Sequence, residues 1–371
     1  MTDRRVALAY AGHYKNPPRD PTGRTAPRSY LFNDQFDIVY DVSLLDELPA
    51  ETKALYRPLP KWLALAIEIH RRRDEYDAVL SWGEHITIGL MAVQRAARGG
   101  KPHIPMLYWF SNPMVFAAML AFKKTLHAVV TWTSVQRKFA IDRLGIPPER
   151  IYFVNYQVDH IFWGPEQAGV SGGQEDDLVV TAGAEMRDYP TLIEAIRGTG
   201  LRCHIAADHV RFSLGRRINA EGLKKMAGAG VTVGAVSLPE LRKLYARARF
   251  VVMPLQPSNT NHGLTVILEA MAMGKAVICS KTEGQVDIIR DGETGLLVAQ
   301  GDPEALRAAM ISLRNDPERA RRIGAAARAY IEKYHTIDEF CHNVRAAVDA
   351  SLDGRWAGRD GALPATRMSH I

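Results

Sequence analysis

Short runs of apolar residues alternate with segments of helical periodicity along almost the whole chain. The apolar runs predict buried strands, and the intervening segments carry apolar residues at the spacing of amphipathic helices. Strands are expected at Arg5–Tyr10, Phe36–Val42, Ala78–Ser81, Ile104–Trp109, Ala128–Trp132, Ile151–Asn155, Leu178–Ala182, Cys203–Ala207, Val231–Val233, Phe250–Pro254, Lys275–Ser280 and Gly295–Val298. Helices are expected at Lys61–Arg73, Ile86–Arg98, Pro113–Lys123, Val135–Leu144, Tyr189–Arg197, Pro239–Ala248, Gly263–Met273, Pro303–Arg314, Glu318–Lys333 and from Ile337 to about Ser351. Buried strands joined by helices predict an α/β fold with parallel sheets.

A stretch without periodicity divides this pattern into two halves. Residues 159–177 are rich in Gly, Pro and acidic residues, which is typical of an interdomain linker. With 371 residues the chain is also too long for one ordinary core. We therefore expect two Rossmann-like doubly wound domains facing across a cleft, over residues 1–158 and 178–335. Residues 336–371 are expected to form a helix that packs back toward the N-terminal domain, followed by a flexible tail.

Composition narrows the setting in which the protein works. Hydrophobic residues make up 47% of the chain and charged residues 24%, as in globular proteins, and no apolar run is long enough to span a membrane. The three cysteines, Cys203, Cys279 and Cys341, lie far apart in predicted strands or helices, which fits neither a disulfide framework nor a metal site. We expect a cytoplasmic protein. Its net charge of +6 suits anionic substrates, or contact with the inner face of a membrane.

The segment from Pro257 to Ser280 carries the clearest chemistry. It consists of a polar loop, a short helix and a buried strand, with Gly274 expected to end the helix. Gly263 lies at the first turn, where free N–H groups and the positive end of the helix dipole suit a phosphate. Glu269 lies among apolar neighbours, where an ionised carboxylate is costly without a partner. A helix that offers a diphosphate site and a carboxylate for a ribose predicts nucleotide binding.

Five segments in order resemble the retaining nucleotide-sugar glycosyltransferases of GT-B fold. They are residues 144–162, Arg187–Ile193, Val233–Leu241, Leu268–Val277 and Asp291–Pro303. The resemblance spans most of the chain and is most specific in its second half. It implies an acceptor-binding N-terminal domain and a donor-binding C-terminal domain. The implied reaction moves a sugar from a nucleotide-diphosphate sugar to an acceptor hydroxyl by front-face attack, with no metal and no cofactor. The implied acceptor is a saccharide, a lipid-linked molecule or a small molecule, and no nucleic acid takes part.

The resemblance also assigns residues to roles. Glu269 is expected to bind the ribose, and Arg187 to contact the diphosphate, alone or with Lys275 or Lys281. The implied donor-binding set is Gly12, Arg187, Val236, Asn261, His262, Gly263, Leu264, Thr265 and Glu269. The implied catalytic residues are His85 and Arg187, and His13, Trp109 and Asn112 are expected to contact the acceptor. His85 follows a predicted strand at its carboxyl end, where residues of a ligand site belong. Its alternative role is to cap the next helix.

Two departures from the family pattern keep other functions open. The family usually has two glutamates separated by seven residues, and here Asn261 occupies the first position. It also often has an arginine after the glycine that ends the first strand of the donor domain, where this chain has Ala184 after Gly183. The alternatives are therefore a non-catalytic sugar-nucleotide-binding protein or a GT-B-fold sugar-nucleotide epimerase. Peripheral membrane contact through Trp62, Leu63 and Leu65 and the basic end of their helix is a further alternative.

Overall fold

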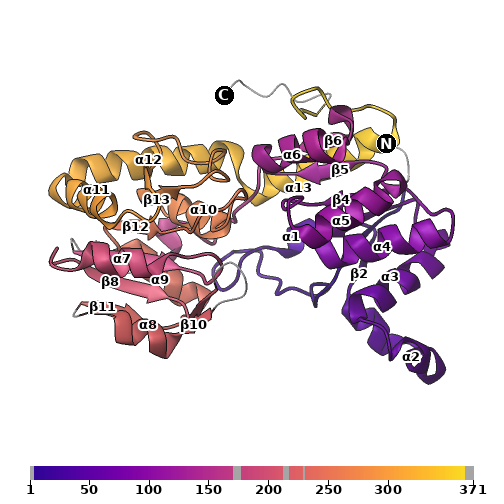
Figure 1. The fold of residues 1–371 in the computed structure, drawn as a ribbon, viewed down its shortest axis with the longest axis horizontal. Helices are drawn as coiled ribbons and strands as arrows, with labels where there is room; N and C mark the ends of the chain where they lie inside the picture. Colours follow the sequence, from indigo (N-terminus) through magenta and orange to yellow (C-terminus); the bar gives the residue numbers. More distant parts are fainter. Residues whose placement is uncertain (1–3, 170–176, 212–216, 229, 364–371) are drawn as a thin grey trace. The chain divides into compact units, whose positions relative to one another are not determined.

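The computed structural model describes residues 4–169, 177–211, 217–228 and 230–363. Two six-stranded parallel sheets with flanking helices confirm the predicted α/β fold (Figure 1). Each sheet belongs to its own compact unit. Unit 1 comprises residues 1–18, 29–156 and 338–371, and unit 2 comprises residues 19–28 and 157–337. Of the predicted linker, residues 170–176 lie outside the described residues, and the part before them belongs to unit 2.

The sheet of unit 1 has the strand order β2-β1-β3-β4-β5-β6. Its strands are β1 (Val6–Tyr10), β2 (Ile38–Tyr40), β3 (Ala78–Trp82), β4 (His103–Met106), β5 (Val129–Thr131) and β6 (Ile151–Phe153). Its helices are α1 (Tyr30–Asn33), α2 (Ala50–Tyr56), α3 (Lys61–Arg71), α4 (Glu84–Ala96), α5 (Pro113–Phe122), α6 (Ser134–Leu144) and α13 (Ile337–Leu352), with short 3-10 turns such as Lys123–Thr125. The strand order reverses between β1 and β3, which pair directly.

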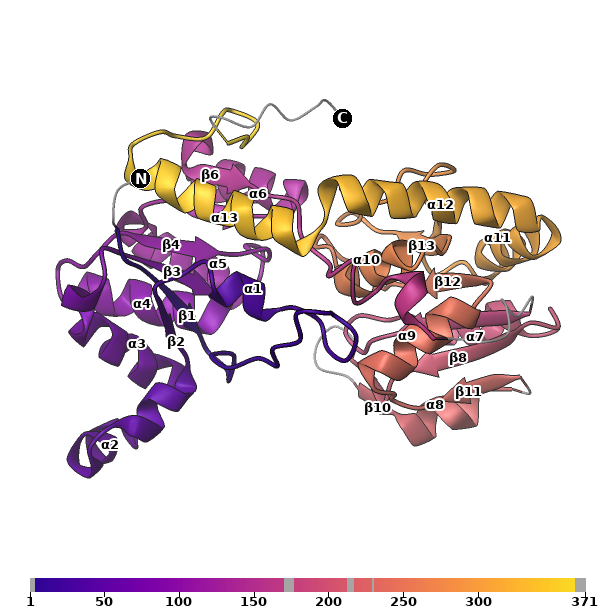
Figure 2. The same cartoon turned by 180° about the vertical axis from the view of Figure 1, so that it is seen from behind.

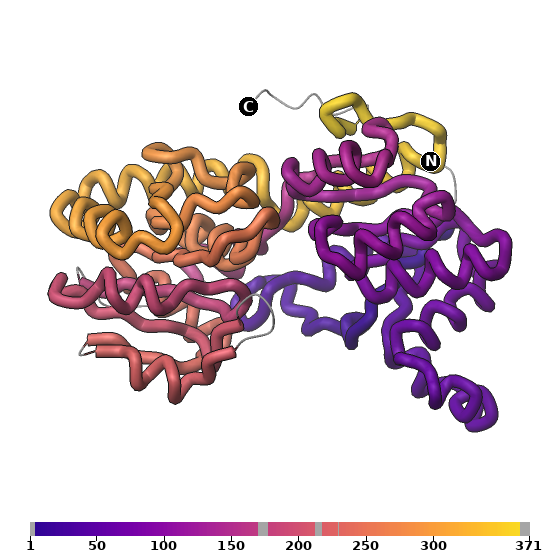
Figure 3. The backbone as a smooth tube through the Cα atoms, viewed as in Figure 1, coloured from indigo at the N-terminus to yellow at the C-terminus, as the bar shows by residue number. Residues whose placement is uncertain are grey.

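Helices cover both faces of this sheet. Leu65 and Ile69 of α3 pack with Leu90 of α4 against one face, which α5 and α6 continue. On the other face the ring of Phe32 in α1 lies 5.4 Å from that of Phe340 in α13, between centroids. Figure 2 shows α1 and α13 on this side, and Figure 3 lets the reader follow the chain by colour into α13. The helix predicted to pack back toward the N-terminal domain is thus part of unit 1.

The sheet of unit 2 has the strand order β11-β8-β7-β12-β13-β14. Its strands are β7 (Leu178–Ala182), β8 (Arg202–Ala206), β11 (Val231–Val233), β12 (Phe250–Met253), β13 (Val277–Lys281) and β14 (Leu296–Ala299). Its helices are α7 (Tyr189–Ile196), α8 (Ala220–Met226), α9 (Leu238–Arg247), α10 (Leu264–Ala272), α11 (Pro303–Asn315) and α12 (Pro317–Tyr334). This order corresponds to 3-2-1-4-5-6 counted along the chain, and it reverses between β7 and β12. An added antiparallel hairpin, β9 (His209–Arg211) with β10 (Arg217–Asn219), was not predicted.

The turn between α10 and β13 forms as the sequence predicts. Gly274 follows the helix in the left-handed region, with φ of 67°. Its N–H donates to the carbonyl of Met271, and the N–H of Lys275 donates to that of Ala270. This Schellman arrangement satisfies the last carbonyls of the helix and leads the chain directly into the buried strand.

Residues 19–28, although early in the chain, are fastened to unit 2. The guanidinium of Arg28 forms an ion pair with the carboxylate of Asp159, 2.8 Å between Nη2 and Oδ1. Both side chains are largely buried, and the backbone N–H of Arg28 also donates to this carboxylate. The guanidinium of Arg242 donates to the carbonyls of Arg24 and Phe162. These charged hydrogen bonds give the segment a structural role.

Candidate active site

The N-terminus of α10 lies at the point where the strand order of unit 2 reverses. β7 and β12 are adjacent there, and their carboxyl ends lead into the loops that carry Arg187 and Gly263. In open α/β sheets, ligands bind outside the carboxyl ends of the strands at such a point. Gly263 is the N-cap, with φ of 83°, and no side chain caps the helix. Among the described residues, the N–H groups of Thr265 and Val266 have no hydrogen-bond acceptor. The helix therefore presents two free donors at its positive end.

Arg187 lies against this helix start and is only 4% exposed. Its Nε donates to the carbonyl of Ala182 at 2.9 Å, and its Nη1 to that of Glu185 at 2.6 Å. A Cβ atom added to Gly183 would lie 2.5 Å from Nη2, and one added to Gly263 would lie 3.3 Å from Nη1. The guanidinium thus fits between two glycines. No carboxylate of the described residues forms an ion pair with it, and a buried cation without an anionic partner is costly.

The loop that carries Arg187 is held on both sides. Met186 adopts φ of 55°, an uncommon conformation for a residue with a long side chain. Its N–H donates to the carbonyl of Arg211 in the β9–β10 hairpin, and its carbonyl accepts from the N–H of Gln256. The amide of Gln256 also donates to the carbonyl of Arg187 at 2.8 Å. These bonds hold the strained backbone and fix where the guanidinium points.

Glu269 lies on the second turn of α10 and is 7% exposed. Burial raises the pKa of its carboxyl group to about 8, against the opposing influence of the nearby Arg187 charge. Within the described residues its carboxylate has no hydrogen-bond donor. The hydroxyl of Tyr245 on α9, whose pKa is raised by burial and next by Glu269, likewise has no partner there. Tyr245 was not predicted, because in the sequence it resembles any apolar position of its helix.

The loop before α10 is buried as well. Asn261 is 4% exposed, and its Nδ2 has no acceptor within the described part of the chain. Burial and the Arg187 charge lower the pKa of His262 to about 4, so its ring is neutral at pH 7. The amide of Gln285 donates to the carbonyl of His262 at 2.6 Å. A Cβ atom on Gly284 would overlap the backbone of Thr260, so the loop lies directly on the turn after β13.

The remaining donor-site predictions differ in outcome. Lys275 as a phosphate ligand is wrong, because its Nζ donates to the carbonyls of Ala246 and Ala248 at the end of α9. Lys281 is exposed at the carboxyl end of β13 and remains a candidate. Leu264 has a buried side chain, so it offers only backbone to a ligand, whereas Thr265 is exposed.

Two more donor candidates lie farther from α10. Val236 is half-buried and follows β11 at the edge of the unit 2 sheet. Gly12 lies in unit 1, after β1, and a Cβ atom there would lie 2.6 Å from the ring of Tyr14. The absence of a side chain at Gly12 therefore leaves room for the Tyr14 ring. Contact of Gly12 or Val236 with the donor stays a prediction.

At the reversal point of the unit 1 sheet, His13 and His85 follow the carboxyl ends of the adjacent strands β1 and β3. His13 follows β1, His85 lies in the first turn of α4 after β3, and both are exposed. The His85 ring lies 6.0 Å from that of Trp62, between centroids. The alternative capping role of His85 is wrong, because Gly83 is the N-cap and no side chain bonds there.

The two acceptor candidates after β4 lie in the same unit. Trp109 is half-buried. Asn112 caps α5, since its Oδ1 accepts from the N–H groups of Met114 and Val115 at 3.0 and 3.4 Å. Only the side-chain nitrogen of Asn112 remains to contact an acceptor substrate. The roles of Trp109 and Asn112 stay predictions.

Comparison with known proteins decides the family. The family model described as "Glycosyl transferases group 1" matches residues 176–330, which include β7 to α12 and the whole α10 site. Residues 176–330 belong to the group 1 glycosyltransferases. A curated relative in this group, D-inositol 3-phosphate glycosyltransferase of Thermomonospora curvata, is 26% identical over 229 residues, covering 54% of this chain and 51% of the relative. The lipopolysaccharide core biosynthesis mannosyltransferase LpcC of Rhizobium leguminosarum is 31% identical over 178 residues, covering 47% of each chain.

Solved glycosyltransferase structures share the fold over nearly the full chain. Anabaena Alr3699/HepE in complex with UDP-glucose aligns with a TM-score of 0.69 at 15% identity, covering 93% of this chain and 99% of that one. Sucrose-phosphate synthase from Thermosynechococcus elongatus aligns with a TM-score of 0.68 at 15% identity, covering 95% and 100%. These likenesses confirm the predicted GT-B fold. This chain spans only about half the length of the two curated relatives above.

Two further observations concern membranes and metals. Among the described helices, none is long and apolar enough to cross a membrane. In the described ranges, no three His, Cys, Asp or Glu side chains gather as a metal site requires. The three cysteines are buried, and none of them forms a disulfide.

Proposed function

We propose that this chain is a retaining glycosyltransferase that uses a nucleotide-diphosphate sugar, with the donor held at the N-terminus of α10. The observation that carries the proposal is the buried guanidinium of Arg187, placed beside free N–H groups and without a carboxylate partner in the described residues. A diphosphate supplies the missing negative charge to both groups. The group 1 family match over residues 176–330 supports the same assignment.

Glu269 is the second contact with the donor. A carboxylate two helical turns or less from the phosphate site is placed to accept hydrogen bonds from the vicinal hydroxyls of a ribose. Bound hydroxyls replace water around the carboxylate, which compensates its burial. The unpartnered Nδ2 of Asn261 supplies a donor for the sugar, at the position where the family usually has a carboxylate. We propose that the Asn261 amide donates a hydrogen bond to a hydroxyl oxygen of the donor sugar.

The chemistry proposed for Arg187 is stabilisation of the leaving group. Negative charge grows on the diphosphate as the bond to the sugar breaks. A fixed guanidinium and fixed N–H dipoles stabilise that charge more in the transition state than in the ground state. The acceptor hydroxyl attacks from the face that the diphosphate leaves, and its proton passes to the leaving phosphate, so the anomeric configuration is retained. His85 and His13 are proposed to orient the acceptor.

One experiment tests the reaction and its rivals together. The full chain is incubated with a panel of UDP-, GDP- and dTDP-sugars, and the products are followed by NMR. UDP-sugars come first, because Anabaena HepE was solved with UDP-glucose. Slow release of nucleoside diphosphate with an α-configured sugar from an α-configured donor supports a retaining transferase. Conversion to an isomeric sugar nucleotide indicates an epimerase, and binding without turnover indicates a binding protein.

The proposal includes catalysis without a metal ion. Turnover in the same assay is expected to persist in EDTA, since Arg187 and the α10 N–H groups supply the positive charge that a metal ion would otherwise bring to a diphosphate. Loss of turnover in EDTA that added Mg²⁺ or Mn²⁺ restores would contradict this part of the proposal.

A further inference from the structure

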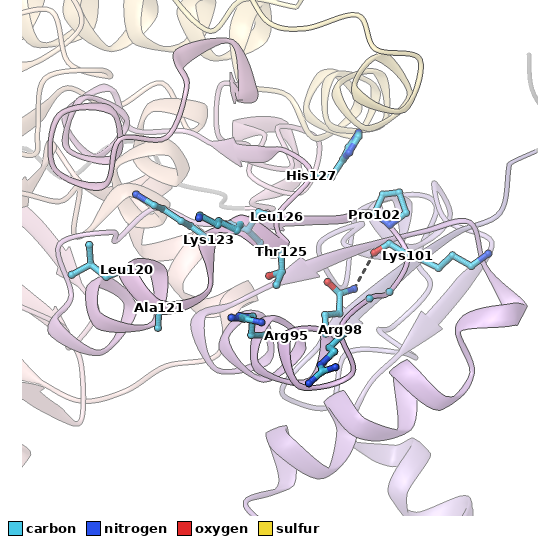
Figure 4. A pocket seen from close by; sticks show the side chains of 14 residues that line it. Arg95, Arg98, Lys101, Pro102, Leu120, Ala121, Lys123, Thr125, Leu126 and His127 are labelled. Atoms are coloured by element: carbon cyan, nitrogen blue, oxygen red, sulfur yellow. Dashed lines mark hydrogen bonds between the residues drawn. The ribbon is translucent and has the colours of Figure 1, made fainter.

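A strongly basic pocket lies on unit 1, at the opposite ends of the sheet strands from His13 and His85. Its lining comes from the loop before β4, the loop before β5 and the ends of α4 and α5, so it lies at the amino ends of the parallel strands. The pocket has a volume of about 900 Å³. Five lining residues are cationic at pH 7 and none is acidic: Arg95, Arg98, Lys101, Lys123 and Lys124, joined by His127. Figure 4 shows these side chains, with Lys101 pointing outward.

These cations are not explained by internal pairing. Lys123 donates to the carbonyl of Leu144, but the side chains of Arg95, Arg98, Lys101 and Lys124 have no partner among the described residues. Cations are favourable at helix C-termini, and α4 and α5 both end here. Two helix ends, however, offer together roughly one negative charge against five positive ones. The pocket therefore carries an excess of positive charge, which attracts anions.

An apolar crevice adjoins the basic pocket and shares part of its wall. It has a volume of about 250 Å³ and is lined by Val129, Ile146, Pro147 and Arg150 together with the shared Lys123, Lys124, Leu126 and His127. A ligand that fills both cavities needs an anionic group next to an apolar chain. A soluble phosphate satisfies only the first of these requirements.

The helix beside the pocket has an exposed apolar face. α5 contains no charged residue, and its exposed residues recur on one side: Pro113, Met114, Ala117, Leu120 and Ala121. Met114 is 44% exposed and Leu120 54%, and Leu120 and Ala121 also line the basic pocket. By contrast, Leu65 cannot take part in the alternative membrane contact of α3, because its side chain is fully buried in the core of unit 1.

We propose that this surface binds an anionic phospholipid bilayer. The lipid phosphate enters the basic pocket, an acyl chain or its upper part enters the crevice, and the exposed face of α5 lies in the interface. A second copy of the chain is a poor occupant, since a symmetric contact would oppose two basic pockets. The proposal concerns unit 1 alone and does not depend on the donor site of unit 2.

Vesicle co-sedimentation of the full chain tests the proposal. The vesicles contain phosphatidylcholine alone or with about one third phosphatidylglycerol, at about 0.1 M salt so that surface charge is only partly screened. Strong binding is expected only to the anionic vesicles. Arg98→Gln with Lys124→Gln is expected to weaken it about tenfold or more, since each basic residue near an anionic surface contributes about a factor of five. Met114→Gln with Leu120→Gln is expected to weaken the binding that remains at high salt.

The matched control removes two charges elsewhere on the same unit. Arg71→Gln with Arg73→Gln, at the end of α3, is expected to change vesicle binding less than twofold, and thermal melting confirms that all variants fold. Equal loss from both charge pairs, or equal binding to neutral vesicles, would overturn the proposal. A soluble arm uses glycerophosphoglycerol, the headgroup without chains. If it binds through Arg98 and Lys124 while vesicles do not bind, the pocket takes a free phosphate ester and the membrane proposal is wrong.

Discussion

The two sheets reverse their strand order at corresponding places but surround those places differently. At the reversal point of unit 2, the ionisable groups of Arg187 and Glu269 are both less than a tenth exposed. At the reversal point of unit 1, His13 and His85 are exposed. Buried, unpartnered charges require one ligand of fixed chemistry, whereas exposed side chains tolerate many. The comparison teaches that the proposed donor site lies in the buried part of unit 2, whereas His13 and His85, proposed to orient the acceptor, lie on an exposed surface of unit 1.

The largest expected effect comes from removing the buried cation. Arg187→Ala should weaken nucleoside diphosphate binding by roughly 30- to 4,000-fold, since truncating one partner of a buried charged contact costs about 2–5 kcal/mol. The corresponding nucleoside, without phosphates, should lose little affinity. Isothermal titration calorimetry with both ligands measures the difference. Arg322→Ala, at an exposed position of α12, is the control and should bind like the wild type.

Removing the ribose contact should have the next largest effect. Glu269→Ala is expected to weaken nucleotide binding by about 10- to 100-fold, because hydrogen bonds to a charged group contribute about 1.5–3 kcal/mol each. The loss should be similar for nucleoside and nucleoside diphosphate, in contrast to Arg187→Ala. Unchanged affinity for both ligands would remove Glu269 from the donor site.

The exposed side of the comparison predicts a smaller change of another kind. His85→Ala should lower sugar transfer by about tenfold, as expected for the loss of a hydrogen bond that orients the acceptor. Donor binding and donor hydrolysis should stay unchanged, because His85 lies in unit 1. Steady-state transfer and hydrolysis rates separate the two roles. Parallel loss of both rates would assign His85 to the donor instead.

The smallest effect concerns stability and pH. The pKa of Glu269 is about 8 in the folded chain and 4.5 as its ordinary value, so between these values the unfolded chain releases a proton that the folded chain keeps. Stability from this group is therefore complete below about pH 4.5 and is lost as the pH rises toward 8. Glu269→Gln, without nucleotide, should match the wild type near pH 4.5 and melt several degrees higher near pH 8.5, since each 1 kcal/mol shifts Tm by about 2–4 °C.

Melting curves across this pH range measure the effect. If the melting temperatures of the wild type and Glu269→Gln change with pH in parallel over the whole range, the Glu269 carboxylate is ionised in the folded chain, and the protein compensates its burial without a ligand. The conclusion that Glu269 needs a ligand to compensate its burial would then be wrong.

Much of the fold was predictable because buried strands are short, apolar and separated by periodic helices. The boundaries of β7 and β11 agree with the prediction, and the others differ by a few residues. The missed elements are short or expose most of their residues. α1 is four residues long, α2 has no buried residue, α8 has one, and the hairpin strands β9 and β10 are three residues long and largely polar.

The site was predictable where residue type and position suffice. The start of α10 and the buried place of Glu269 follow from the pattern of Leu264–Ala272. The burial of Arg187 does not, because it depends on Gly183 and Gly263 approaching from two loops. Lys275 was misassigned for the same reason, since the carbonyls it binds belong to α9, nearly thirty residues earlier.

The contact at Gly284 has a consequence for redesign. Any side chain at this position would strike the backbone of Thr260, so the turn after β13 and the loop before α10 have mutually fitted shapes. The N–H of Gly284 also donates to the carbonyl of Ser258 at 3.0 Å. A loop transplanted from a relative to change the donor sugar would meet a turn shaped for another backbone. Residues 257–263 and 282–285 should therefore be exchanged together, as one cassette.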